Sequence, residues 1–257
     1  MANKDTVTKT ISVAFILCVV CSIIVSMAAV QLRPAQKANK ALDIQVNILK
    51  AAGLYEAGAD IDEAFESIET KLVDLSTGKF SEELEVVSYD QIKAAKNTSL
   101  SDELSSEDDI ASLSRREKYA KVYVVNGEQG IEKIVLPIRG YGLWSTLKGF
   151  IALESDLNTV VGLGYYEHGE TPGLGGEVDN PRWKGVWPGK KVYSADGSVA
   201  LSVIKGIVSE TTPNAEHKVD GLSGATLTSD GVDYMVKFWL GDMGYAPFLT
   251  NLKNGEA

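Results

Sequence analysis

The sequence predicts an α+β fold: a single N-terminal transmembrane helix, then a soluble domain with an antiparallel sheet and flanking helices. Three observations support this prediction. Residues 11–30 form an uncharged apolar run, residues 34–75 show apolar positions at helical spacing, and the chain beyond residue 119 changes to β-branched runs separated by turns. Helices followed by hairpin-connected strands and a last helix are typical of α+β rather than of alternating βαβ units.

The apolar run ISVAFILCVVCSIIVSMAAV (residues 11–30) has the length of a membrane span. Twenty helical residues reach roughly 30 Å, the thickness of a bilayer's hydrocarbon core. A cleaved signal peptide is the alternative, since Ser26-Met27-Ala28 resembles a cleavage site. Because a secretory apolar region usually covers only about 7–15 residues, we favour an uncleaved anchor with residues 1–10 as its tail.

Charges on the two sides of the span do not set its orientation. Lys4, Lys9 and the amino terminus lie before it, and Arg33, Lys37 and Lys40 lie after it. By the positive-inside rule these two groups nearly balance. The charge pattern alone therefore leaves the sidedness of the soluble domain open.

Both cysteines lie within the predicted span, as Cys18 and Cys21. A C-x-x-C pair can serve redox or metal chemistry, but in hydrocarbon a free cysteine behaves as a small apolar residue. A metal site shared with another protein of a complex is the alternative. The rest of the sequence has no cysteine, which excludes a disulfide or a cysteine-ligated cluster there.

The charge balance argues against a nucleic-acid partner. The chain carries a formal charge of −10, although its first 33 residues are slightly basic. Proteins that bind nucleic acids usually present a basic surface to the phosphates. We therefore expect no nucleic-acid binding.

Residues 34–118 are expected to form a helical and acidic N-terminal part of the soluble domain. The spacing of apolar residues predicts a helix over 34–53, with Gly53 as its C-cap, and a second helix over about 60–75, with Asp60 as its N-cap. Residues 97–110 carry five carboxylates and indicate a solvated segment.

Residues 119–257 are expected to form the core of the soluble domain. A hairpin is predicted from two apolar runs around Asn126-Gly127, and a last helix from the stripe over 230–240, ended by Gly241. The predicted strands are 119–125, 131–138, 150–153, 159–166 and 199–208.

Two segments carry the candidate chemistry. The first is the glycine-rich loop HGETPGLGG (168–176), in which backbone N–H groups can approach a ligand, although its spacing fits neither a dinucleotide fingerprint nor a P-loop. The second is DGLSGATLTS (220–229), just before the last helix, where helix amides favour a phosphate. In the alternative interpretation, Thr228 or Ser229 is an ordinary N-cap. The hydroxyl of Thr226 is then left without a role.

These segments resemble the FMN-binding domain family. S-G-A-T at 223–226, within D-G-x-S-G-A-T-x-T-S, looks like its flavinylation motif, and E-T-P-G-L-G at 170–175 matches its second landmark. With the anchor and G-L-W at 142–144, the whole chain is similar to the family of C subunits of sodium-translocating NADH:quinone oxidoreductases.

The resemblance implies that FMN is attached covalently, as a phosphoester to Thr226, by a dedicated flavin transferase. It also implies that Ser223, Gly224 and Ala225 shape the turn that presents this threonine. In the family, the tether retains the cofactor and leaves the isoalloxazine ring free for electron transfer.

The same resemblance implies which residues contact the flavin. The loop residues concerned are Glu170, Thr171, Leu174 and Gly175. Trp144 is our candidate for packing near the ring, with a plain core tryptophan as the alternative. Lys205 is a candidate cation near the flavin N1–C2=O region, with a solvated lysine as the alternative. We interpret His168 as a locally hydrogen-bonded loop histidine rather than a proton relay.

At the level of function, the resemblance implies a one-electron carrier within a sodium-pumping NADH:ubiquinone oxidoreductase. Its soluble domain would face the periplasm from a single span in the bacterial inner membrane, with the tail in the cytoplasm. The sequence has no nicotinamide fingerprint, so partner subunits would oxidise NADH, move sodium and reduce quinone. We assign no catalytic or metal-ligating residue to this chain.

Three other functions are compatible with these motifs. The chain could be the G subunit of the related ferredoxin:NAD oxidoreductase (Rnf) complex, which shares the S-G-A-T motif and the anchor. It could be a membrane-anchored flavin-binding module without a redox role. It could also be a ligand-binding ectodomain without a cofactor.

Overall fold

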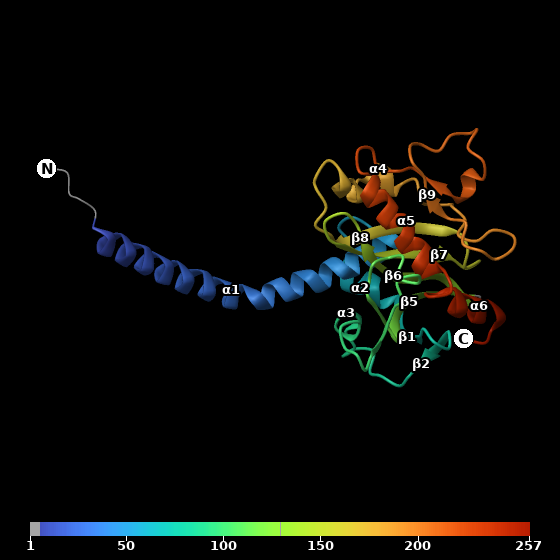
Figure 1. Ribbon diagram of the computed structural model, residues 1–257. Coiled ribbons are helices and arrows are strands. Elements are labelled where there is room, and N and C mark those ends of the chain that lie inside the picture. Colours follow the sequence, from blue (N-terminus) through green and yellow to red (C-terminus); the bar gives the residue numbers. More distant parts are fainter. Residues whose placement is uncertain (1–5, 129) are drawn as a thin grey trace. The chain divides into compact units, whose positions relative to one another are not determined.

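The computed structural model describes residues 6–128 and 130–257 (Figure 1). The chain divides into two units, residues 1–44 and 45–257. Part of the predicted tail 1–10, including Lys4, lies outside the described residues. The fold class predicted from the sequence is confirmed: an apolar N-terminal helix precedes a sheet-rich domain with flanking helices.

The first unit consists of most of helix α1, Val7–Ala51. Its most apolar 18-residue window has a mean hydropathy of 2.9, which is enough to cross a membrane, and no other described helix meets this standard. The span over 11–30 and the helix over 34–53, predicted as two elements, form one continuous helix, because α1 continues through Pro34. A proline removes one backbone donor and bends a helix, but the helix formers on both sides of it sustain the pattern.

The end of α1 belongs to the second unit and is firmly packed. Ile48 and Leu49 are fully buried. Gly53 ends the helix at φ +67°, and the N–H of Leu54 bonds the carbonyl of Leu49 at 2.8 Å, as in a Schellman motif. The prediction of Gly53 as the C-cap is thus confirmed.

The predicted helix over 60–75 is only half correct. Helix α2 covers Ile61–Glu66, and the Asp60 carboxylate caps it by accepting from the N–H of Asp62 at 2.9 Å. Residues Ile68–Asp74 instead form strand β1, which pairs along its whole length with β5 (Tyr119–Gly127). Ile68, Leu72 and Val73 are buried in that pairing. Their spacing also suits a helix, so only the partner strand decides between the two structures.

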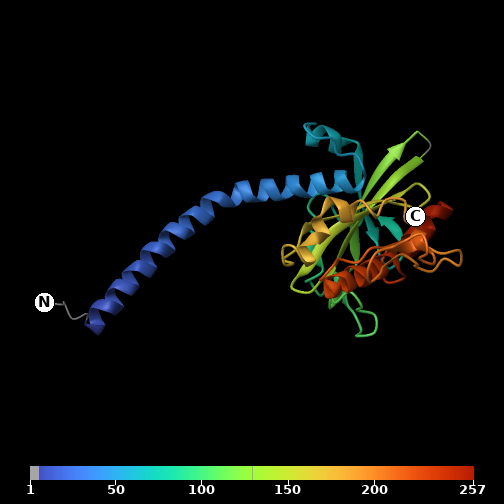
Figure 2. The same ribbon diagram turned by 90° about the horizontal axis from the view of Figure 1, so that it is seen from above.

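A six-stranded antiparallel sheet in the order β2-β1-β5-β6-β7-β8 is the centre of the domain (Figures 1 and 2). The predicted hairpin is confirmed, although pairing of its strands extends to Gly127 and Gly130, and Gln129 lies outside the described residues. The remaining strands of the sheet are β2 (Lys79–Ser81), β5 (Tyr119–Gly127), β6 (Gly130–Tyr141), β7 (Thr146–Glu154) and β8 (Val160–Glu167).

Short elements fill the long connections. The predicted strand over 199–208 is mostly irregular, since only Ser202–Val203 form a strand, in a parallel pair. The short elements are α3 (Gln91–Ala94), β3 (Ser101–Glu103), β4 (Arg115–Glu117), the 3-10 helix η1 (Gly175–Asp179), α4 (Pro181–Lys184), β9 (Ser202–Val203), the 3-10 helix η2 (Ala215–His217) and β10 (Lys218–Val219).

Helix α5, Thr226–Leu240, packs across the sheet against β6. A side chain at Gly140 would come within 2.7 Å of Met235 Cβ, so the missing side chain lets the helix approach. The indole N–H of Trp239 donates to the Arg139 carbonyl oxygen at 2.7 Å. Gly241 caps the helix as predicted. Helix α6, Ala246–Asn254, completes the core and was not predicted.

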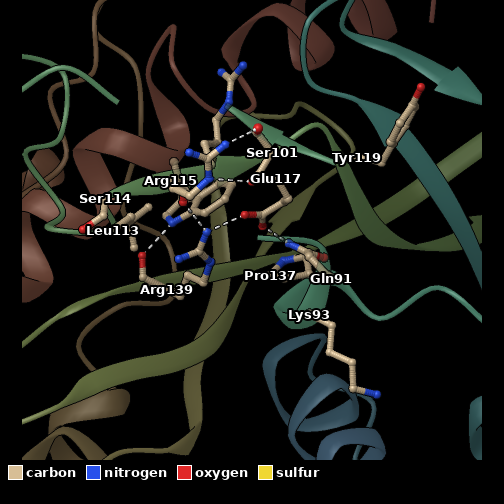
Figure 3. Close-up of polar contacts among 12 residues, drawn as sticks. Gln91, Lys93, Ser101, Leu113, Ser114, Arg115, Glu117, Tyr119, Pro137 and Arg139 are labelled. Carbon is tan, nitrogen blue, oxygen red and sulfur yellow. Dashed lines mark hydrogen bonds and ion pairs between the residues drawn. The ribbon is translucent and has the colours of Figure 1, made fainter. Parts of the chain in front are cut away.

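A buried ion pair ties the segment between β1 and β5 to the sheet (Figure 3). Arg139 on β6 and the fully buried Glu117 on β4 form a hydrogen-bonded pair at 2.5 Å. The amide of Gln91 donates to the other carboxylate oxygen of Glu117, while its own oxygen accepts from the N–H of Lys121. The segment between β1 and β5 is therefore anchored to the centre of the sheet.

Candidate functional site

The carboxylate of Glu170 lies at the centre of the candidate site. Glu170 follows β8 and is only 5% exposed. One of its oxygens accepts from the backbone N–H groups of Leu143, Trp144 and Ser145 at 3.0 to 3.2 Å. The other accepts from the hydroxyl of Thr228, on the first turn of α5, at 2.8 Å. Three segments that are distant in the sequence thus meet at one side chain.

Two glycines make room for this carboxylate. A Cβ at Gly142 would lie 2.7 Å from one Glu170 oxygen, and a Cβ at Gly175 would lie 2.7 Å from the other. The same Cβ at Gly175 would come within 2.5 Å of the Thr228 hydroxyl. Both positions therefore require glycine because of space, not because of backbone angles.

Glu170 is ionised at neutral pH. Burial by itself raises the pKa of this carboxyl, but its hydrogen bonds from Trp144, Thr228, Leu143 and Ser145 outweigh burial and lower the pKa below the ordinary value of 4.5. The negative charge is spread over these donors. The carboxylate at the centre of the site is therefore an anion whose two oxygens already accept hydrogen bonds from the protein.

Helix α5 begins at Thr226, earlier than predicted. Its N-cap is Ala225, and Gly224 precedes it in a left-handed conformation at φ +73°. The interpretation of Thr228 or Ser229 as an N-cap is wrong. Thr228 bonds Glu170 instead, and the Ser229 hydroxyl accepts from the Leu222 N–H and donates to the Ala225 carbonyl.

Thr226 stands exposed at the first position of α5. Within the described part of the chain, its hydroxyl and the backbone N–H groups of residues 226–228 have no hydrogen-bond partner. The first turn also carries no acidic residue. Free amides and the positive end of the helix dipole make this position suitable for a phosphate. The residues present therefore fit an anion at Thr226.

Apolar side chains surround this helix start. Trp144 is 66% exposed, which excludes the alternative of a core tryptophan, and Leu227 is 60% exposed. Leu174 is also exposed, and a Cβ at Gly224 would lie 3.2 Å from its Cδ2, so the two predicted loops lie side by side. Exposed apolar groups beside an anion site match the two ends of a phosphorylated aromatic ligand.

The structure brings together most of the predicted site residues, but not Lys205. Thr171 closes the glycine-rich loop, since its carbonyl accepts from the N–H of Leu174 and of Gly176. Lys205 is exposed after β9, in a turn bonded to Gly221 through Gly206. Among the described residues, no hydrogen bond or ion pair joins Lys205 to Glu170 or to the donors of Glu170.

His168 is locally hydrogen-bonded, as interpreted. Its Nε2 lies 2.7 Å from the carboxylate of Asp179, and its Nδ1 accepts from the Glu170 N–H at 3.2 Å. Asp179 also pairs with Lys184 at 2.8 Å. This arrangement orders the loop that leads to Glu170.

Thr228 and the backbone of 143–145 belong to the site but were not predicted from the sequence. Thr228 is 58 residues from Glu170, and neither residue carries a sequence signal that points to the other. Backbone donors carry no side-chain signature at all. The glycine at 142 beside Trp144 was the one available hint of a close approach.

Comparisons with known proteins agree with this geometry. The family model described as FMN-binding domain matches residues 142–241, which contain every residue of the site. NqrC of Shewanella oneidensis superposes with a TM-score of 0.77 at 36% identity, covering 84% of this chain and 99% of that one. The C subunit of the Na(+)-translocating NADH-quinone reductase from Parabacteroides distasonis gives 0.66 at 29% identity, covering 85% and 97%.

Full-length relatives extend the likeness to the apolar N-terminal helix. The C subunit of the Na(+)-translocating NADH-quinone reductase of Pseudomonas aeruginosa is 52% identical over 100% of both chains. That of Vibrio alginolyticus is 48% identical over 99% of this chain and 98% of its own, and that of Pasteurella multocida 47% over 98% and 97%. The chain therefore belongs to the family of C subunits of the Na(+)-translocating NADH-quinone reductase, an oxidoreductase complex, and carries its FMN-binding domain.

Proposed function

We propose that this protein is a one-electron carrier with FMN joined through its phosphate to Thr226. One observation carries the proposal: the exposed Thr226 hydroxyl stands at the start of α5 beside backbone amides that have no hydrogen-bond partner among residues 6–128 and 130–257. Esterification replaces the hydroxyl proton of Thr226 with the FMN phosphoryl group, so the protein gains the mass of FMN minus water. A flavin transferase acting on Ser223–Thr226 would supply the flavin activated as a phosphoanhydride. The bond from the threonine oxygen to phosphorus would form as the anhydride P–O bond breaks, the activating phosphate group would leave, and the hydroxyl proton would pass to a base of the transferase.

The residues of α5 hold the phosphate in this proposal. The N–H groups of residues 226–228 donate to its oxygens, and the helix dipole stabilises its charge. Gly224 and Ala225 shape the turn, while the exposed Ser223 leaves the approach to Thr226 open. The tether fixes the cofactor without using the ring.

The apolar residues around the helix start hold the ring. Trp144, Leu174 and Leu227 offer exposed apolar surface for stacking, and the backbone of Thr171 and Gly175 borders it. When bound, FMN supplies reversible electron-transfer chemistry, and these side chains keep it oriented and limit access of water.

The rest of the proposal concerns location and partners. Residues 11–30 would anchor the chain by a single pass in the bacterial inner membrane, with 1–10 cytoplasmic. Residues 34–118 and 119–257 would then lie on the periplasmic side. The other subunits would oxidise NADH, move sodium and reduce ubiquinone, since the sequence has no nicotinamide fingerprint.

Peptide mass analysis of the native protein tests the covalent link. We expect an FMN-minus-water adduct on the peptide containing Thr226, absent in Thr226→Ala and retained in Ser209→Ala, which removes an exposed hydroxyl outside the S-G-A-T motif. Flavin fluorescence should remain on the denatured chain. An unmodified Thr226, or an adduct on Ser223 or Thr228, would refute the site. A flavin lost on denaturation would favour a non-covalent flavin-binding module, and a colourless protein a ligand-binding ectodomain.

A further inference from the structure

We propose that Glu170 is a positioning residue that fixes the Trp144 turn to the first turn of α5. The inference rests on the proposed function where it concerns the flavin. It changes the role that the family resemblance implies for Glu170. The carboxylate would act on the ligand through Trp144 and Thr226 rather than by touching it.

The hydrogen bonds of Glu170 leave little capacity for a ligand. One oxygen receives three backbone N–H groups, and the other receives the Thr228 hydroxyl and the Leu143 N–H at 3.3 Å. The residue is 5% exposed. A carboxylate that is buried and has both oxygens bonded serves the protein's own structure.

The β6–β7 turn is built around this anion. Tyr141 and Thr146 are its last paired residues, and the Gly142 N–H bonds the Ser145 carbonyl at 2.8 Å. Between them, three consecutive N–H groups converge on Glu170, which is the geometry of an anion-binding nest. A second bond, from the Gly169 N–H to the Ser145 hydroxyl at 2.6 Å, holds the same two segments together.

The bonds from Glu170 to the backbone of residues 143–145 and to Thr228 are here called the clamp. The clamp uses only part of the first turn of α5, so a second anion can bind the rest. Glu170 takes the side chain of Thr228, two residues after Thr226 on the same turn. The backbone amides of that turn remain available for a phosphate. Because one carboxylate bonds both the turn that carries Trp144 and the turn that carries Thr226, it sets the spacing between indole and attachment point.

A first experiment needs no flavin. Full-length Thr226→Ala protein in detergent is compared with the same protein carrying Glu170→Gln, by amide hydrogen exchange at Leu143, Trp144 and Ser145. Loss of charge-assisted bonds should speed exchange at these amides at least about tenfold. The matched control is Glu177→Gln, in the 3-10 helix η1 that follows the glycine-rich loop, whose carboxylate accepts from the Asn180 side chain instead. Unchanged exchange in Glu170→Gln would overturn the clamp.

A second experiment uses the flavin-bearing protein and a milder variant. Thr228→Val removes one donor, and Thr228→Ser restores it. We expect Thr228→Val to change the visible circular dichroism and the midpoint potential of the bound flavin, and Thr228→Ser to return both to wild-type values. If Thr228→Val also matches wild type in both, the inference fails although the proposed function stands. If wild-type protein carries no adduct on Thr226, the proposed function itself fails, whereas the exchange experiment still decides the clamp.

Discussion

The hydroxyl of Thr228 donates a 2.8 Å hydrogen bond to the carboxylate of Glu170 across 58 residues of sequence. Both residues are buried, whereas Thr226 and Trp144 beside them are exposed. The site thus has two layers: a buried polar floor, here called the base, formed by Glu170 and Thr228, and an exposed rim formed by Thr226 and Trp144. Substitutions in the base should affect stability and geometry together, and those in the rim should affect the ligand alone.

Replacement of Trp144 should separate ligand contact from folding. Trp144→Ala is expected to change the free energy of unfolding by no more than about 0.5 kcal/mol, because the side chain is 66% exposed. The flavin should remain attached, with an altered visible circular dichroism spectrum. Trp239→Ala is the contrast, since this fully buried indole should cost about 3–5 kcal/mol. Urea unfolding of both variants in detergent measures the difference; a large loss in Trp144→Ala would contradict the assignment.

A methyl group at position 175 should disrupt the base of the site. Gly175→Ala places its Cβ 2.5 Å from the Thr228 hydroxyl and 2.7 Å from Glu170, so about 1–3 kcal/mol of stability should be lost. The amount of FMN adduct per chain should also fall. Gly164→Ala is the matched control, because its Cβ would meet only the Asn47 side chain at 3.7 Å. Equal effects of the two substitutions on urea unfolding would argue against this steric explanation.

Replacing one member of the buried Arg139–Glu117 ion pair should lower the free energy of unfolding more than replacing both members. Arg139→Met or Glu117→Leu alone leaves a buried charge without its partner and should destabilise the domain by about 3–5 kcal/mol. The double variant should be less destabilised than the sum of the two single variants. A double-mutant cycle of unfolding free energies tests the coupling, and strict additivity would show that the pair contributes no interaction of its own.

The contribution of Glu170 to stability should depend on pH in a defined direction. Its folded pKa lies below the ordinary value of 4.5, so folding favours the ionised form. Its stabilisation is complete well above pH 4.5 and is lost as the pH falls through the lowered folded value. The difference in unfolding free energy between wild type and Glu170→Gln should therefore be constant near neutrality and shrink in acid. A difference that grows on acidification would contradict this pKa direction.

The sequence predicted correctly those elements in which the spacing of apolar residues fits only a helix or only a strand. The apolar span, the β5–β6 hairpin and the body of α5 follow directly from hydrophobic patterning. Ile68–Asp74 fit a helical stripe equally well, and only pairing with β5 makes them a strand. The span over 11–30 and the helix over 34–53 were predicted separately, whereas α1 continues through Pro34 and joins them.

The site was predictable only as far as its motifs. Two loops with unusual glycine content drew attention to Glu170 and Thr226, and the structure brings those loops together. The partnership of Glu170 with Thr228 depends on how α5 crosses the sheet. Backbone N–H groups at 143–145 are donors that any residues could supply. Such features follow from tertiary packing and leave no local pattern in the sequence.

The strand order has a consequence for protein engineering. Residues 142–241, which match the FMN-binding domain, supply only β7 and β8 of the six-stranded sheet. Excised alone, this segment would leave β7 unpaired along the edge that β6 covers, and α5 would lose its packing on Gly140. An open apolar edge of this kind promotes aggregation. The segment 142–241 is therefore not expected to fold by itself, and transferring it to another protein would require the strands that precede it in the sequence.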